Sequence, residues 1–358
     1  MTDREALRTE MIRLSGSLMD VQDRLYQMGW TDGLPVVPPT DEAVLKMLHG
    51  TARQPQEVVA VIPPEMREAS VETIAVNAVM AGCLPQYLPV VIAAVEAMAQ
   101  PEFPLAAMQV TTHAVAPLAI VNGPIRSKIG MNCGGGAFGP GNRSNAAIGR
   151  AVRLVLLNVG GSRAWSKCTQ GHPGQYTFCI AENEEDSPWE PLHVERGFPP
   201  DASVVTVNAV EAPRGTSDPG SRSAREVLTT VSLAMSDPAT SQIKYQRGQP
   251  IVCFGIEHAA TIARDGLTKE QVREFIFEHA GIPLQRISEG NRLLRKKHPD
   301  TYIDVGEEGV LPIGMSKEDI LIIVLGGEGK HSCWLPTGVD SVAVSRVIDD
   351  IPVELADE

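Results

Sequence analysis

Residues 168–197 carry the densest collection of reactive side chains in the chain. The segment holds two cysteines, two histidines and a group of carboxylates beside Trp, Phe and Tyr, without the periodicity of one helix or strand. Core segments are periodic and apolar, and ordinary surface loops lack thiol and aromatic side chains at this density. We therefore interpret the segment as the wall of an active site.

Four side chains of this segment are competent ligands for a divalent metal such as zinc, iron or manganese. They are His172, Cys179, Glu182 and His193. Their spacing matches no established metal motif, so a metal held by His172, Glu182 and His193 is one hypothesis. In a competing hypothesis Cys179 is a thiolate nucleophile, and His172 or His193 is its base. A buried and inert Cys179 is the third alternative.

The second half of the segment has two interpretations. Residues 187–190 (Ser-Pro-Trp-Glu) have the form of a capping box with proline at the first helical position, which predicts a helix over 188–196. In a helix His193 and Arg196 share a face and suggest an acid-binding pair. In an extended segment His193 and Glu195 share a face instead and suggest a metal pair.

A glycine-rich segment, residues 133–141, lies between a predicted strand and a predicted helix. Glycines such as Gly135 and Gly136 let backbone amides approach a ligand, and the N-terminus of the following helix favours an anion. We expect a loop that binds the anionic group of a substrate; a tight structural turn is the alternative. The pattern matches neither the P-loop nor the dinucleotide fingerprint, so it shows no ATP or NAD signature.

The residues that follow the glycines are also suited to binding the anionic group of a substrate. Asn142 or Ser144 is expected to cap the helix that follows, and Arg143 to bind a carboxylate or phosphate in a bidentate fork. Near the C-terminus, a predicted strand over 319–325 runs into a second glycine loop that delivers Lys330 and His331. Because ligands gather at the carboxyl ends of strands in α/β sheets, we expect these two to supply a cation and a general base.

The bulk composition limits the class of protein. The chain has 358 residues, 43% of them hydrophobic, and a net charge of −13. This charge argues against nucleic acids and anionic membranes as partners. The apolar run 88–98 is too short to span a bilayer. The first thirty residues lack a signal-peptide pattern and the six cysteines form no Cys-x-x-Cys pair, so we expect a cytoplasmic protein with reduced thiols.

The order of elements predicts an α/β fold with a mostly parallel or mixed sheet flanked by helices. Apolar residues spaced three and four apart predict an amphipathic helix over 3–29. We expect a helical arm over 1–35, an α/β lobe over 36–212 and a second lobe over 213–358, or one continuous domain. Strands are predicted over 58–62, 118–121, 176–181, 204–210, 251–256 and 319–325, and helices over 41–49, 71–82, 87–99, 145–158, 222–235 and 268–280.

Five segments together resemble one bacterial family; they are residues 29–40, 77–83, 139–143, 170–197 and 329–332. Its members are associated with, or fused to, small thioredoxin-like proteins that bear a Sec/Cys-Gly-Ser-Cys motif (the UGSC type). The resemblance spans nearly the whole chain and implies that it is the large partner of a two-part system. Because no Cys-Gly-Ser-Cys occurs here, the resemblance implies that any dithiol chemistry comes from elsewhere.

Three functions follow from these patterns. The leading hypothesis is an enzyme that acts on a small anionic substrate by metal-assisted lyase or hydrolase chemistry. Arg143, the glycine loop and Lys330 would hold the anion. In the second hypothesis, a thiol-dependent oxidoreductase, Cys179 forms a mixed disulfide with a thioredoxin-like partner. The third is a non-catalytic binding subunit. The N-terminal helix also predicts a homo-oligomer.

Overall fold

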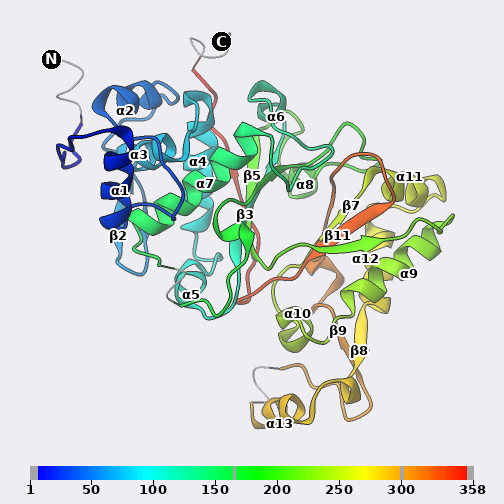
Figure 1. Ribbon diagram of the computed structural model, residues 1–358. Coiled ribbons are helices and arrows are strands. Elements are labelled where there is room, and N and C mark those ends of the chain that lie inside the picture. The colour runs from blue at the N-terminus through cyan, green and yellow to red at the C-terminus, as the bar shows by residue number, and fades with distance from the viewer. Residues whose placement is uncertain (1–6, 164–166, 299–301, 353–358) are drawn as a thin grey trace.

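The chain folds around two four-stranded mixed sheets, as the computed structural model of residues 7–163, 167–298 and 302–352 shows (Figure 1). The first sheet has the order β12-β5-β3-β4, with β3 parallel to β4 and the other pairs antiparallel. Its strands are β3 (Ala116–Asn122), β4 (Cys179–Ala181), β5 (Val204–Val210) and β12 (Val344–Val347). The predicted α/β class is confirmed, with sheets of the mixed kind.

The second sheet has the order β10-β7-β11-β6, in which only β10 and β7 are parallel. Its strands are β6 (Arg214–Ser217), β7 (Ile251–Phe254), β10 (Leu321–Val324) and β11 (His331–Leu335). Two hairpins lie outside these sheets, formed by β1 (Val58–Ile62) with β2 (Arg67–Ser70) and by β8 (Gly281–Pro283) with β9 (Val310–Pro312). The strand β12 comes from the end of the chain, so residues 213–358 contribute to both main sheets.

Side chains that point alternately to the two faces of each strand explain how the two sheets pack. Leu118 and Ile120 of β3 share one apolar cluster with Ile251 of β7 and Ile323 of β10, while Val121 points to the opposite side. Because successive strand residues face opposite sides of a sheet, one face of each sheet contributes to a common apolar layer and the other is covered by helices. A backbone hydrogen bond from Asn183 N, just after β4, to Val324 O of β10 also joins the two sheets.

Helices cover the two outer faces (Figure 1). On the first sheet lie α4 and α7, with α3 packed against both helices, and on the second lie α9 and α11, with α12 packed against α9. The helices are α1 (Leu18–Gln27), α2 (Asp41–Leu48), α3 (Val71–Ala81), α4 (Leu88–Met98), α5 (Leu105–Val110), α6 (Ile125–Lys128), α7 (Arg143–Asn158), α8 (Leu192–Glu195), α9 (Ala224–Met235), α10 (Ser241–Tyr245), α11 (Ile256–Arg264), α12 (Lys269–His279) and α13 (Glu289–Lys297).

Side-chain caps fix several of these helices where the sequence predicted them. Thr40 accepts a hydrogen bond from Ala43 N at the start of α2, and Thr268 with Gln271 forms the predicted capping box of α12. Such caps satisfy backbone donors that have no partner inside the helix. The short helix α11, directly after β7, was not predicted. None of the helices in the described ranges combines the length and apolarity required to cross a bilayer.

The predicted N-terminal helix over 3–29 is wrong in its first half. Residues 7–16 are not helical, and α1 begins at Leu18 (residues 1–6 lie outside the described part). Gly16 has φ +126°, and Ser17 forms a capping box with Asp20, so the helix starts there. The Glu72 carboxylate accepts hydrogen bonds from the backbone N–H groups of Arg8 and Thr9, which hold this stretch on α3 instead. The homo-oligomer stays a prediction.

Candidate functional site

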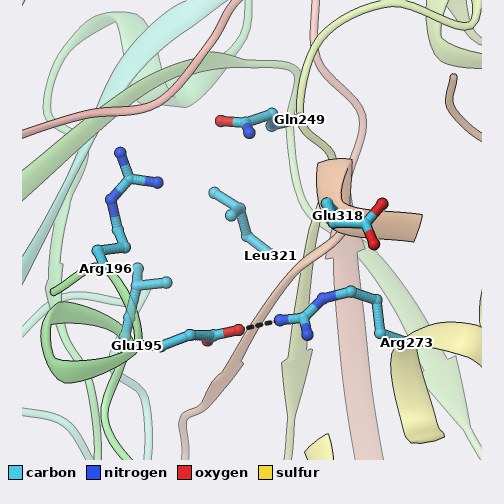
Figure 2. A pocket seen from close by; sticks show the side chains of 7 residues that line it. Glu195, Arg196, Gln249, Arg273, Glu318 and Leu321 are labelled. Atoms are coloured by element: carbon cyan, nitrogen blue, oxygen red, sulfur yellow. Dashed lines mark hydrogen bonds and ion pairs between the residues drawn. The ribbon is translucent and has the colours of Figure 1, made fainter. Parts of the chain in front are cut away.

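A cavity of about 360 Å³ lies between α8 and the second sheet (Figure 2). This volume lies at the lower end of the range of small-molecule sites, about 300–1,000 Å³. Its wall combines four charged side chains, one amide and two leucines, and is formed by Leu192, Glu195, Arg196, Gln249, Arg273, Glu318 and Leu321. Of the residues singled out from the sequence, Arg196 and Glu195 line this cavity.

Arg196 presents a positive charge to the cavity that no carboxylate neutralises at close range. Its Nε donates to Ser345 Oγ at 2.6 Å and its Nη2 to the Ala343 carbonyl at 2.8 Å, both neutral acceptors. Within the described residues no acidic oxygen lies within 4.0 Å of the guanidinium. Burial lowers its pKa from the usual value, and the more distant Glu195 partly offsets this. An anion in the cavity would remove that burial cost.

Glu195, by contrast, is already neutralised. Its carboxylate pairs with the guanidinium of Arg273 (Figure 2). Lys269 Nζ lies 2.7 Å from its other oxygen. Arg273 also pairs with Glu270 and donates to the Ile320 carbonyl. These ion pairs attach α8 to α12 and form a rigid wall for the cavity. The Glu318 carboxylate differs, because it is exposed and has no ion pair among the described residues.

Glu182 positions α8 from behind. Its Oε2 accepts hydrogen bonds from Asn122 Nδ2 at 2.6 Å and from Leu192 N at 2.8 Å, so it caps the first turn of α8. Glu182 is fully buried, and burial raises its pKa. Its Oε1 has no hydrogen-bond partner in the described structure. Glu182 is a buried carboxyl group next to the cavity wall rather than part of the cavity.

Of the two interpretations of residues 188–196, the helical one holds only in part, since α8 comprises Leu192–Glu195 alone. Ser187 does not cap it: its hydroxyl accepts from Trp189 N and donates to the Trp189 carbonyl. Proline at position 191 disfavours helical geometry for the residue before it, so the helix begins only after Pro191. Arg196 and the buried His193 are close in sequence, but they have different partners: His193 Nε2 lies 3.4 Å from the Pro200 carbonyl.

The glycine loop is held by backbone contacts. Asn142 caps α7 as predicted, accepting from Asn145 N, and its amide donates to the Gly130 carbonyl. Arg143 donates from Nε and Nη2 to the Gly82 carbonyl, so the fork expected for a substrate anion is occupied by the main chain. Neither residue lines the cavity of Figure 2.

The two glycine loops predicted from sequence meet in space. Gly326 N donates to the Cys133 carbonyl at 2.9 Å, and a Cβ atom at Gly327 would lie 3.0 Å from Gly135 Cα. Gly136 has φ +73°, a conformation that favours glycine. The loop after β10 therefore packs directly on the loop before α7, a relationship that the sequence did not indicate.

Lys330 and His331 lie beyond this contact. Lys330 Nζ donates to the Ser221 carbonyl at 3.2 Å, and His331 is exposed at the start of β11. Neither side chain lines the cavity. Lys330 and His331, predicted to supply a cation and a general base, therefore do not share a cavity with Arg196.

Cys179 lies in the apolar core beneath α7. Burial raises the pKa of its thiol far above the usual range, with a smaller contribution from Cys83. No hydrogen bond from a histidine reaches its sulfur in the described residues, and the ring of His172 instead packs edge-on against Phe178 at 5.7 Å. These surroundings match the buried, inert alternative, because a thiol that attacks an external substrate needs access and a base or charge that favours the thiolate.

The three predicted metal ligands are separated. His172 Nδ1 accepts from Gly174 N, Glu182 binds Asn122 and Leu192, and His193 faces the Pro200 carbonyl. In the ranges that the structure describes, no three His, Cys, Asp or Glu side chains are grouped so that they could hold a metal ion. The predicted set does not fit a metal in this arrangement, so we derive no step through one. Metal content stays a prediction for elemental analysis.

Most of the cavity residues were not selected from the sequence. Gln249, Arg273 and Glu318 come from three separate segments with no motif, and the local sequence around each carries no signal for a site. Comparison of the chain with protein-family models, curated proteins and solved structures finds no match. The resemblance to the UGSC-associated family therefore stays a prediction, and the function has to be argued from the geometry.

Proposed function

We propose that the protein is an enzyme that binds a small carboxylate or similar anion in the cavity of Figure 2 and acts on it by lyase or hydrolase chemistry. The observation that carries the proposal is Arg196, a half-buried guanidinium without a close carboxylate at the wall of a 360 Å³ cavity. A bound carboxylate gains charge-assisted hydrogen bonds there, each worth about 1.5–3 kcal/mol.

The other side of the cavity supplies a second charged group. Figure 2 shows Glu318 on the opposite side of Leu321 from Arg196, with its exposed carboxylate directed away from Leu321, and Gln249 above Leu321. In the proposed reaction Arg196 orients the substrate carboxylate and Gln249 donates a hydrogen bond to a substrate carbonyl. Glu318, which forms no ion pair in the described residues, accepts a proton from the substrate or from an attacking water. Glu195 is a weaker candidate base, because two cations already neutralise it.

Calorimetric titration with succinate and with inorganic phosphate tests the binding step. Arg196→Met keeps the apolar stem and removes the charge, so we expect at least about tenfold weaker binding of the probe that binds the wild type. Arg225→Met on the exposed face of α9 is the matched control and should bind as the wild type does. Equal binding by both variants, or no binding of either probe to the wild type, contradicts the proposal.

Turnover separates the enzyme from the binding subunit. With small carboxylic acids followed by proton NMR, Glu318→Gln should lower kcat by about 10² while substrate affinity changes little. Arg196→Met should act mainly on KM. Binding at Arg196 without turnover of any acid would support the non-catalytic alternative instead.

A further inference from the structure

Cys253 of β7 and Cys333 of β11 occupy directly opposite positions in an antiparallel strand pair. Opposite residues in such pairs have Cα atoms about 4.5–5.5 Å apart. Disulfides join residues whose Cα atoms are about 4.4–6.8 Å apart. The backbone therefore already places these two residues at the separation that a disulfide requires.

The side chains share one face and touch. Cys253 belongs to the apolar layer between the sheets, and the partly buried Cys333 packs against that layer. Burial, followed by a hydrogen bond with the Cys333 thiol, holds the pKa of Cys253 well above its usual range. Both thiols are free in this structure. Cys333 is the more accessible of the two, so an external reagent would reach it first.

We propose that Cys253 and Cys333 form a reversible disulfide, with Cys333 as the entry thiol and Cys253 as the resolving thiol. The Cys333 thiolate attacks one sulfur of a small external disulfide, forms a mixed disulfide and releases one thiol. Cys253 then loses its proton to solvent and attacks the Cys333 sulfur, which releases the second thiol. Two protein thiols are oxidised, and the external disulfide is reduced to two thiols.

The proposed disulfide would lie next to the two glycine loops. Cys333 lies two residues after the start of β11. The loop before β11 contacts the loop of Cys133, because Gly326 N donates a hydrogen bond to the Cys133 carbonyl. A covalent link between β7 and β11 would fix the base of that loop. The inference rests on strand register and thiol contact alone, and it stands whether or not the cavity binds an anion.

Equilibration of the native, full-length protein in glutathione buffers tests the proposal. An internal disulfide releases two glutathiones, so the ratio of oxidised to reduced protein should rise in proportion to [GSSG]/[GSH]², and non-reducing peptide mapping should find a Cys253–Cys333 link. For a glutathione adduct alone, the ratio of adduct to free thiol would rise in proportion to [GSSG]/[GSH]. Cys333→Ser should abolish the link, and Cys253→Ala should leave a persistent glutathione adduct on Cys333.

The control is Cys168→Ser, whose thiol is partly exposed and whose removal should leave the link intact. Circular dichroism of each variant shows whether it is folded. If Cys253→Ala does not fold, the loss of the link in Cys333→Ser is the result that tests the proposal. A wild-type protein that stays reduced, one that shows only the adduct, or a link between other cysteines would overturn the proposal.

Discussion

The Glu182 carboxylate holds the backbone N–H of Leu192 at 2.8 Å, so a fully buried acid at the end of β4 determines where α8 begins. The same oxygen accepts from Asn122, and Oε1 has no partner in the described structure. Through this contact the first sheet positions Glu195 and Arg196 at the cavity. Both the stability of the fold and the shape of the cavity depend on it.

Two replacements of Glu182 should separate the effect of its hydrogen bonds on stability from the effect of its charge. Glu182→Ala leaves Leu192 N without its acceptor and removes one of the two hydrogen bonds of Asn122 Nδ2, which keeps Glu184 Oε1. We expect a loss of about 1–3 kcal/mol in the free energy of unfolding by urea. Glu182→Gln keeps an acceptor and removes the buried charge. Because the folded-state pKa of Glu182 is raised, its stabilising contribution is full below the unfolded pKa and is lost as pH rises through the folded pKa. The glutamine variant should therefore lose less stability than the wild type between pH 4 and neutral pH. Parallel pH dependence in the two proteins would contradict this account.

His172 should stay neutral under mildly acidic conditions. Burial, with repulsion from Arg153, lowers its pKa to about 4. A lowered histidine pKa stabilises the fold above the unfolded pKa, and the contribution is lost as pH falls through the folded value. We expect the His172 ring resonance, assigned by comparison with His172→Gln, to remain constant in NMR spectra between pH 7.5 and 5.5. A titration of this resonance near pH 6.5 would contradict the burial of the ring.

Two glycines allow the cost of a positive φ to be separated from the cost of a steric clash. Gly123 has φ +82°, and a Cβ atom there would lie 2.0 Å from the Ala202 carbonyl oxygen. Gly130 has φ +63° with no atom within 4 Å of the added Cβ. Gly130→Ala should cost only the backbone strain, about 1–2 kcal/mol. Gly123→Ala should cost clearly more in the same urea unfolding experiment. Equal costs would show that the contact between Gly123 and Ala202 is not as close as the structure shows.

Cysteine alkylation should follow burial. Cys83, Cys179 and Cys253 are buried and burial raises the pKa of each thiol, whereas Cys133, Cys168 and Cys333 are partly exposed. Because thiolates react and thiols do not, brief treatment of the native protein with iodoacetamide should modify only members of the exposed group. Peptide mass spectrometry reads out each site, with unfolded protein as the control for full reactivity. Rapid modification of Cys179 would restore it as a candidate nucleophile.

Local patterns predicted many of the elements well. The helices α2, α3, α4, α7, α9 and α12 lie close to their predicted bounds because apolar periodicity and caps such as Thr40 and Thr268 act within one or two turns. The N-terminal helix was over-extended, because its first half is held by Glu72, which is about 60 residues away in the sequence. The helix near residue 190 was misplaced, because the constraint at Pro191 outweighed a capping-box pattern.

The sequence alone determined the α/β class and most of the elements, and it identified residues 168–197 as a candidate site, because periodicity, caps and residue chemistry are local properties. Only the tertiary structure decided which of those residues face a cavity. The cavity combines Arg196 with Gln249, Arg273 and Glu318, and the strand register combines Cys253 with Cys333, over separations that range from about 50 to 120 residues. Burial also sets their protonation, since desolvation raises the pKa of the Cys179 thiol and lowers the pKa of His172, and neither shift can be read from the residue type.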